Sequence, residues 1–282
     1  MMMKKLMKIF LLLAVAQLFV LPAAEAQNTI LKTAPAFKAG ETLKCNLYFN
    51  WKFVWVRAGD ASLIIRDTVF EGKKAMAMSL LSTTNSRADK FFKMRDTLTT
   101  IFSPDMRPLY YHKASFEGKR YYLNQAWYDY STPGTIKINQ SYRRDKEPVI
   151  TRTDYSAIPV YDMMSLLAYA RTIDFSSMKE GQRLTFPVAT GKRIEPQYLV
   201  YRGKTVMEND NDVKYNCITV SLVKIDSKGR ERSIINFHVT DDENKLPILL
   251  DLVLNFGSAK AKLSSYRGLL YPIMPAVTKN KK

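Results

Sequence analysis

The chain has 282 residues, and its 43 Lys and Arg against 26 Asp and Glu give a formal charge of +17 at pH 7. It contains only two cysteines, and no apolar run after residue 26 approaches the roughly 18 residues that a membrane helix needs. These counts exclude a small disulfide-built scaffold and a bundle of membrane helices. They leave room for one large domain or two smaller ones.

The first 26 residues have the three parts of a signal peptide. Three lysines lie between positions 4 and 8, an apolar run extends from Ile9 to Leu21, and Ala24-Glu25-Ala26 is an A-x-A cleavage site. We therefore expect cleavage between Ala26 and Gln27 and a soluble, periplasmic mature protein without a transmembrane span. The leader contains three of the 43 basic residues and one of the 26 acidic residues, so 40 and 25 remain, a formal charge of +15.

This basic charge indicates an anionic partner, and the predicted compartment decides its class. Export removes nucleic acid from consideration and leaves lipopolysaccharide, anionic phospholipid headgroups and acidic glycans. Electrostatic attraction to any of them would be weak and sensitive to salt. The alternative is a basic surface that serves solubility alone.

The residues before the centre of the chain read as strands and turns. After a flexible lead-in at 27–36, apolar and polar residues alternate with the period of a half-buried strand. Arg57-Ala58-Gly59-Asp60 has the composition of a turn, and the segment 87–95 fits either a helical turn or an irregular strand. The predicted strands of this first meander are 43–56, 61–66, 74–83, 109–116, 120–130, 135–143 and 148–155.

Residues 161–172 have the only convincing helical period of the mature chain. Asp162 is the expected N-cap, and Arg171 closes the segment. The apolar residues recur at i, i+3, i+4 and i+7 and form one stripe: Met163, Leu166, Leu167 and Ala170. A single amphipathic helix between two β-rich halves must bury its stripe against a sheet, so we expect a structural helix that plugs the sheet. The alternative is a helix that covers an open pocket.

A second meander follows the helix, with strands predicted at 182–189, 197–201, 215–223, 232–240, 246–256 and 259–266. Residues 268–282 form a C-terminal tail. The predicted fold is therefore all-β, over residues 37–267: a large curved antiparallel sheet or open barrel with one central helix at about 161–172.

Four sequence features in one order resemble the exported bacterial family called domain of unknown function 3108, in its Bacteroides-type periplasmic form. They are Phe37-x-x-Gly40-Glu41-x-Leu43, an aromatic strand ending in Ala58-Gly59, the Asp162-x-x-Ser165 helix with Arg171, and Asp242-x-Asn244-x-Leu246-Pro247. The resemblance extends from about Phe37 to Tyr266. It implies a β-rich fold and no established activity, so no catalytic residue follows from it.

Few residues have the spacing of a catalytic or metal site. The two histidines, His112 and His238, lack the neighbouring ligands of a zinc site. A nucleophile and an acid could still meet either histidine in space. We predict no catalytic residue, no metal and no cofactor.

The cysteines leave two alternatives open. Cys45 and Cys217 lie near opposite ends of the mature chain, and export would permit a disulfide between them. Both also lie in alternating strand patterns, where buried free thiols pack equally well.

Residues 107–144 are rich in aromatic and basic side chains. Aromatic rings stack on sugars or enter acyl regions, and neighbouring cations pair with phosphates or carboxylates. The predicted ligand-binding residues are Tyr110, Tyr121, Trp127, Tyr128, Arg120 and Arg143. The alternative is that tyrosine is simply a good strand residue.

The leading hypothesis is a non-enzymatic cell-envelope protein that binds a lipid, a lipopolysaccharide-like molecule or a glycan. One alternative is a structural or assembly partner of another envelope protein, without a small ligand. The other is a hydrolase acting on envelope polymers.

Overall fold

The computed structural model describes residues 36–51, 54–226, 228–254 and 257–275. The predicted signal peptide, its cleavage site, nearly all of the lead-in at 27–36 and the end of the C-terminal tail lie outside these residues. The following description concerns the described residues alone.

The first meander contains eight strands, β1–β8, which pair with their sequence neighbours in antiparallel fashion. A 3-10 turn, η1 (Ala88–Lys90), lies between β3 and β4. The strand bounds are β1 Thr42–Trp51, β2 Val54–Phe70, β3 Lys73–Thr84, β4 Met94–Phe102, β5 Pro108–Glu117, β6 Arg120–Asp129, β7 Ile136–Arg144 and β8 Ile150–Ser156.

One α-helix, α2 (Met163–Ala170), is described between the two meanders, within the predicted segment. The second meander contains six strands, again paired in sequence order. Their bounds are β9 Arg183–Ala189, β10 Ile194–Glu208, β11 Lys214–Ile225, β12 Glu231–Thr240, β13 Pro247–Leu254 and β14 Gly257–Arg267.

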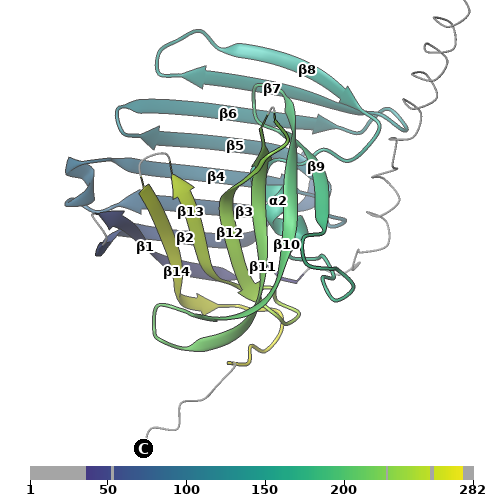
Figure 1. Ribbon diagram of the computed structural model, residues 1–282. Coiled ribbons are helices and arrows are strands. Elements are labelled where there is room, and N and C mark those ends of the chain that lie inside the picture. Colours follow the sequence, from purple (N-terminus) through teal and green to yellow (C-terminus); the bar gives the residue numbers. More distant parts are fainter. Residues whose placement is uncertain (1–35, 52–53, 227, 255–256, 276–282) are drawn as a thin grey trace, which may run out of the picture. The chain divides into compact units, whose positions relative to one another are not determined.

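The two meanders form one sheet because the first strand pairs with the last. β1 and β14 run antiparallel from Thr42 opposite Arg267 to Phe49 opposite Ala259. The resulting order is β8-β7-β6-β5-β4-β3-β2-β1-β14-β13-β12-β11-β10-β9 (Figure 1). The predicted fold class, a large antiparallel sheet with one helix, is confirmed.

The turn predicted at Arg57–Asp60 is wrong, because β2 continues through these residues without a break. Gly59 is required there for another reason. A Cβ atom on Gly59 would lie 2.0 Å from the carbonyl oxygen of Thr83 on β3, so only glycine permits this close approach of two backbones. Gly59, which resembles a turn residue in the sequence, lies within a long strand at a point of close packing.

The turn between β9 and β10 rests against the first meander. The side-chain amide of Asn124 on β6 donates to the carbonyl of Thr190 at 2.6 Å, and the N–H of Gly191 donates to Gln140 on β7 at 3.0 Å. Gly191 has a φ of +87°, and a Cβ there would lie 2.8 Å from the Cβ of Asn124. These contacts join the β9–β10 hairpin, at one end of the strand order, to β6 and β7, near the other end.

The main core lies on the helix side of the sheet. It combines fully buried residues from both meanders with residues of α2, among them Ile65, Met78, Phe102, Met164 and Leu263. We call this side the inner face of the sheet.

Candidate functional site

Helix α2 has apolar side chains on more than one face. Met164 and Ala168 are almost completely buried in the core, and α2 lies against β3, β4 and β9. The predicted stripe is turned toward the second meander, where it lines a small cavity. Its burial varies: Leu166 is 4% exposed, whereas Met163 is 41% exposed. The stripe therefore does not form the most deeply buried face of the helix, because α2 lies between two parts of one sheet.

The start of the helix is fixed by a buried capping box. The Asp162 carboxylate accepts from the N–H groups of Met164 at 2.9 Å and Ser165 at 2.8 Å, and the Ser165 hydroxyl accepts from the N–H of Asp162 at 2.8 Å. Thr100 on β4 donates its hydroxyl to the second Asp162 oxygen at 2.9 Å. Burial raises the pKa of Asp162 to about 6 in spite of these hydrogen bonds.

The end of the helix is held by a buried ion pair. The Arg171 guanidinium donates to both oxygens of Glu41, at 2.5 and 3.2 Å, and to the carbonyl of Asn244, at 3.0 and 2.7 Å. It also lies over the ring of Phe37. The Asn244 side chain in turn binds the backbone of Tyr271. Three of the four motif regions noted in the sequence thus meet at Arg171, and their role there is structural.

The cavity between α2 and the second meander has a volume of about 60 Å³. Its walls are almost entirely apolar and come from the helix stripe and from β10, β11 and β12, including Leu199, Val220, Leu222, Phe237 and Val239. A cavity of this size is smaller than the roughly 150 Å³ that accepts a benzene molecule. The closed arrangement therefore has room for only a fragment of an apolar ligand.

The cavity lies at the deep end of two apolar rows. Residues directly opposite each other in antiparallel strands share a face of the sheet. One row crosses eight strands from β9 to β2: Leu184, Leu199, Leu222, Ile235, Leu252, Ala259, Phe49 and Val56. The second row consists of Tyr201, Val220, Phe237, Leu250, Ala261, Leu47 and Gly59. No charged residue interrupts either row.

Exposure increases along the first row. Leu184, Leu199 and Leu222 are buried, with at most 5% of each exposed. Ile235 and Leu252 are half-buried, and Val56 at the far end is 50% exposed. The rows therefore form a continuous apolar surface that begins beneath α2 and becomes accessible to solvent toward β1 and β2.

One row of the same face turns polar beyond β2, beside the apolar core residues Met78 and Phe102. Continuing across the strands from Ala61, the opposed residues are Ser82, Asp96, Ser115, Tyr122 and Arg144. The buried Ser115 hydroxyl lies 2.6 Å from a carboxyl oxygen of Asp96 and 2.6 Å from one of Glu117. Burial raises the pKa of Asp96. Burial also opposes ionisation of Glu117, but hydrogen bonding by Ser115 and the Lys113 charge together lower the pKa of Glu117.

The structure divides the predicted aromatic set between the two faces. Tyr110 and Trp127 are directly opposed on the outer face, with ring centroids 5.4 Å apart, and the register places Tyr121 and Arg143 on the same face. Tyr128 is instead a core residue, 6% exposed, and Arg120 lies opposite Glu117. The six residues therefore do not form one surface, because adjacent positions in a strand point to opposite faces.

Cys45 and Cys217 are both free thiols, so the disulfide alternative is not realised in the structure. Burial raises the pKa of each thiol to about 12. Cys217 belongs to the core, and Cys45 packs against it. Both behave as small apolar residues.

His238 does meet a hydroxyl and a carboxylate, which the sequence alone left open. The Thr219 hydroxyl lies 2.9 Å from Nδ1 of His238, and Asp251 lies 3.2 Å from Nε2. The hydrogen bond with His238 lowers the pKa of Asp251. In a hydrolytic triad the hydroxyl binds Nε2 and the acid binds Nδ1. Thr219, His238 and Asp251 have the reverse arrangement. Among the described residues, no group of three or more His, Cys, Asp and Glu side chains could hold a metal ion.

A larger cavity, of about 740 Å³, lies beside the β10–β11 hairpin. Its lining mixes Asp210 and Asp212 with Lys214, Lys260 and Lys262 around Tyr48 and Trp55. Asp210 already accepts a hydrogen bond from the Tyr48 hydroxyl at 2.8 Å. This mixed surface lacks the chemical uniformity of the apolar rows, which therefore are the stronger candidate site.

No helix among the described residues has the length and apolar character needed to cross a bilayer.

Comparisons with known proteins bear on the family. No curated protein matches the chain. A Brucella abortus structure described as a β-barrel-like protein of domain of unknown function DUF1849 is similar with a TM-score of 0.48 and 10% identity, over 83% of this chain and 99% of that chain.

The model of the family described as "Protein of unknown function (DUF3108)" matches residues 44–264. This range contains every strand of the sheet in whole or in part, together with α2 and the Arg171 and Asn244 positions. The chain belongs to the DUF3108 family of proteins of unknown function.

Proposed function

We propose that the protein is an exported cell-envelope protein that binds the acyl chain of a lipid along the two apolar rows. The observation that carries this proposal is the uninterrupted apolar surface across eight strands, open at β2 and closed beneath α2. The predicted leader supports export, and the basic charge suits an anionic lipid.

The length of the accessible surface suits one acyl chain. Four strand spacings separate Ile235 on β12 from Val56 on β2, which corresponds to about 19 Å at about 4.8 Å per spacing. One leaflet of a bilayer contributes about 15 Å of hydrocarbon. An extended acyl chain would therefore fit along the half-buried part of the first row without displacing α2.

The energy of such a contact indicates a role for the helix. Burying a methylene contributes about 0.8 kcal/mol, so a chain of about twelve methylenes with half its surface covered would gain roughly 5 kcal/mol. Micromolar binding requires about 8 kcal/mol. Tight retention thus needs fuller burial, and the end of the acyl chain inserted into the 60 Å³ cavity beneath α2 would add to it. In this proposal α2 is the cover of the deep end of the site.

A fluorescent fatty acid titrated into the protein tests the proposal. Leu252→Asn puts a polar group in the half-buried part of the row, and Leu252→Trp fills that part while keeping it apolar. Both changes should weaken binding at least tenfold. Trp127→Ala, on the outer face, is the matched control and should bind as the unaltered protein does. Equal affinity in all four proteins, or no binding of the fatty acid at all, would overturn the proposal.

A further inference from the structure

The topology gathers seven strand connections at one edge of the sheet. Sequential strands are antiparallel throughout each meander, so alternate connections lie at the same edge. We call this edge the rim. It comprises the connections β1–β2, β3–β4, β5–β6, β7–β8, β9–β10, β11–β12 and β13–β14. The opposite edge carries the hairpin turns β2–β3, β4–β5, β6–β7, β10–β11 and β12–β13.

The rim carries large apolar side chains where turns usually carry Gly, Asn, Asp and Ser. Phe91 is 76% exposed, Val54 is 63% exposed and Ile150 is 56% exposed. The full set in or beside the rim connections is Val54, Trp55, Val56, Phe91, Phe92, Val149, Ile150 and Val253. Such exposure is unfavourable in water, and apolar surface of this kind is typical of an interaction site.

The two edges also carry opposite charge. Apart from the β9–β10 turn, which rests against β6 and β7, the described rim connections contain seven basic and four acidic residues, a net charge of +3. The five hairpin turns of the opposite edge contain two basic and seven acidic residues, a net charge of −5. Among the strand connections, the positive charge therefore lies on the same edge as the exposed apolar residues.

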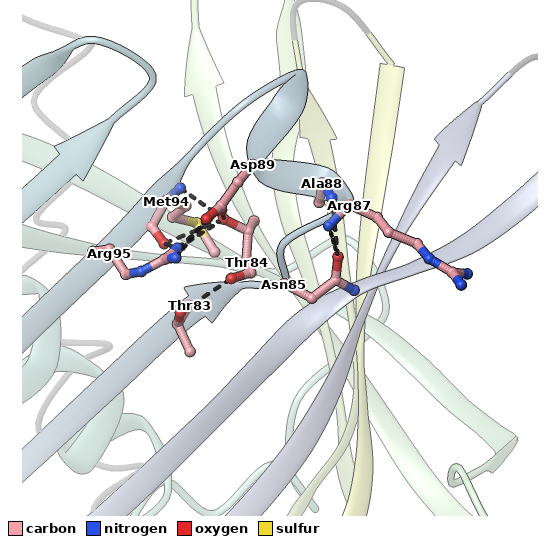
Figure 2. Close-up of polar contacts among 8 residues, drawn as sticks. All are labelled: Thr83, Thr84, Asn85, Arg87, Ala88, Asp89, Met94 and Arg95. Carbon is pink, nitrogen blue, oxygen red and sulfur yellow. Dashed lines mark hydrogen bonds and ion pairs between the residues drawn. The ribbon is translucent and has the colours of Figure 1, made fainter.

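The β3–β4 connection is fixed by its own polar contacts. Asn85 accepts hydrogen bonds from the N–H groups of Arg87 at 3.1 Å and Ala88 at 2.9 Å, which fixes the start of η1. Arg95 binds Asp89 at 2.6 Å, and Thr84 donates to the same carboxylate at 2.5 Å (Figure 2).

The bonds from Arg95 and Thr84 balance the charge of Asp89, the acidic residue of this connection. Arg87 extends away from the cluster in Figure 2. The exposed Phe91 and Phe92 follow η1 directly, between Lys90 and Lys93. The connection therefore presents two aromatic rings between two cations, in a turn fixed by its own polar contacts.

We propose that the rim docks the protein on an anionic lipid bilayer, with its apolar side chains inserted at the headgroup level and its cations against lipid phosphates. Aromatic residues favour this interface, and stable attachment of a peripheral protein needs both apolar insertion and charge. This inference rests on the proposed function, because docking on a bilayer would bring the acyl site to its lipid. Val56 and Leu252, in the open part of the first apolar row, each lie two residues from the strand end at the rim. A docked bilayer would therefore meet the accessible end of the acyl site.

Co-sedimentation with vesicles tests the rim. The vesicles contain phosphatidylcholine with about 30% phosphatidylglycerol, or phosphatidylcholine alone, at salt concentrations from about 0.05 M to about 0.5 M. The unaltered chain should sediment with the anionic vesicles and be released by salt. Val54→Ser combined with Phe91→Ser should lower partitioning roughly tenfold. Val69→Ser, an equally exposed change near the opposite end of β2, is the control and should have no effect.

A charge-reversal pair gives a second, independent comparison. Lys90→Glu with Lys93→Glu should abolish the preference for anionic vesicles, whereas Lys73→Glu with Lys74→Glu at the opposite edge should preserve it. All variants share the same N-terminal residues, so differences among them report on the edges alone. Equal partitioning of rim and control variants, or no vesicle binding at all, would overturn the docking proposal and point to a protein partner for the rim.

Measurement without vesicles separates the two proposals. The rim variants should retain fatty-acid affinity, and Leu252→Trp should lose it while still sedimenting with vesicles. Rim variants that lose fatty-acid affinity in the absence of vesicles would contradict a separate docking surface. Vesicle binding by a chain that binds no fatty acid would overturn the proposed function and leave the rim standing.

Discussion

The inner face of the sheet carries rows of different chemistry in its two parts. The opposed residues are apolar in one row from β9 through β14 to β1 and β2, and in a second row from β10 to β2. From β3 to β5, one row of the same face carries Ser82, Asp96 and Ser115 in successive strands, beside the apolar core residues Met78 and Phe102. Both parts alternate in sequence, so alternation alone does not distinguish them. The register does, because it decides which residues become neighbours across strands and whether an apolar surface is continuous.

Helix α2 lies where the two parts meet, and its anchor should produce the largest effect on stability. Arg171→Ala leaves Glu41 as a buried carboxylate without its partner, which we expect to cost about 3–5 kcal/mol in the free energy of unfolding. Urea denaturation measures this loss. The double change Arg171→Met with Glu41→Leu removes both charges and should recover most of the stability. A near-neutral Arg171→Ala would show that the ion pair does not hold the helix.

The gradient along the first row predicts unequal costs for the same substitution. Leu199→Ala removes a side chain that is 4% exposed and should cost about 2–5 kcal/mol. Leu252→Ala, in the half-buried part, should cost distinctly less because solvent already reaches it. Comparing the urea midpoints of the two variants tests the gradient. Equal losses would mean that the row is covered along its whole length.

The capping carboxylate at the start of α2 predicts a pH dependence. The pKa of Asp162 is raised from 3.8 to about 6, so folding favours its protonated form. Its stabilising contribution is complete below about pH 4 and is lost as the pH rises through 6, a change of roughly 3 kcal/mol. Asp162→Asn keeps a good N-cap and lacks this titration. The stability difference between the variant and the unaltered protein should therefore shift in favour of the variant from pH 4 to pH 7, and a constant difference would contradict the raised pKa.

Much of the fold follows from the sequence because its signals are local. Period-2 alternation predicted most of the strands, but it missed β4 and joined β1 to the start of β2. The helical period with Asp162 predicted α2 within two residues of its observed bounds. The turn at Arg57–Asp60 failed because Gly59 serves a backbone contact with β3, which is remote in sequence. The 3-10 turn at Ala88–Lys90 depends on Asn85 and Arg95 contacts that no periodic pattern records.

The candidate site depended on information that a single strand does not contain. Tyr128 resembled its neighbour Trp127 in sequence, yet one is in the core and the other is on the outer face. The apolar rows were visible only as separate alternations, such as Leu250 and Leu252, until pairing brought them together. The contacts of Glu41 and Asn244 with Arg171 were indicated in the sequence only by the order of the motifs. Cross-strand register and bulges supply what the residue pattern lacks.

The central claim is that an acyl chain lies on the apolar part of the inner face. Photolabelling with a fatty acid that carries a diazirine at its chain end, followed by peptide mapping, tests it most directly. We predict adducts on β12, β13, β14 and β1, at or beside Ile235, Leu252, Ala259 and Phe49. Labelling should decrease when an unlabelled fatty acid competes. Adducts on the polar row around Asp96 and Ser115, or on the outer face around Trp127, would contradict the claim.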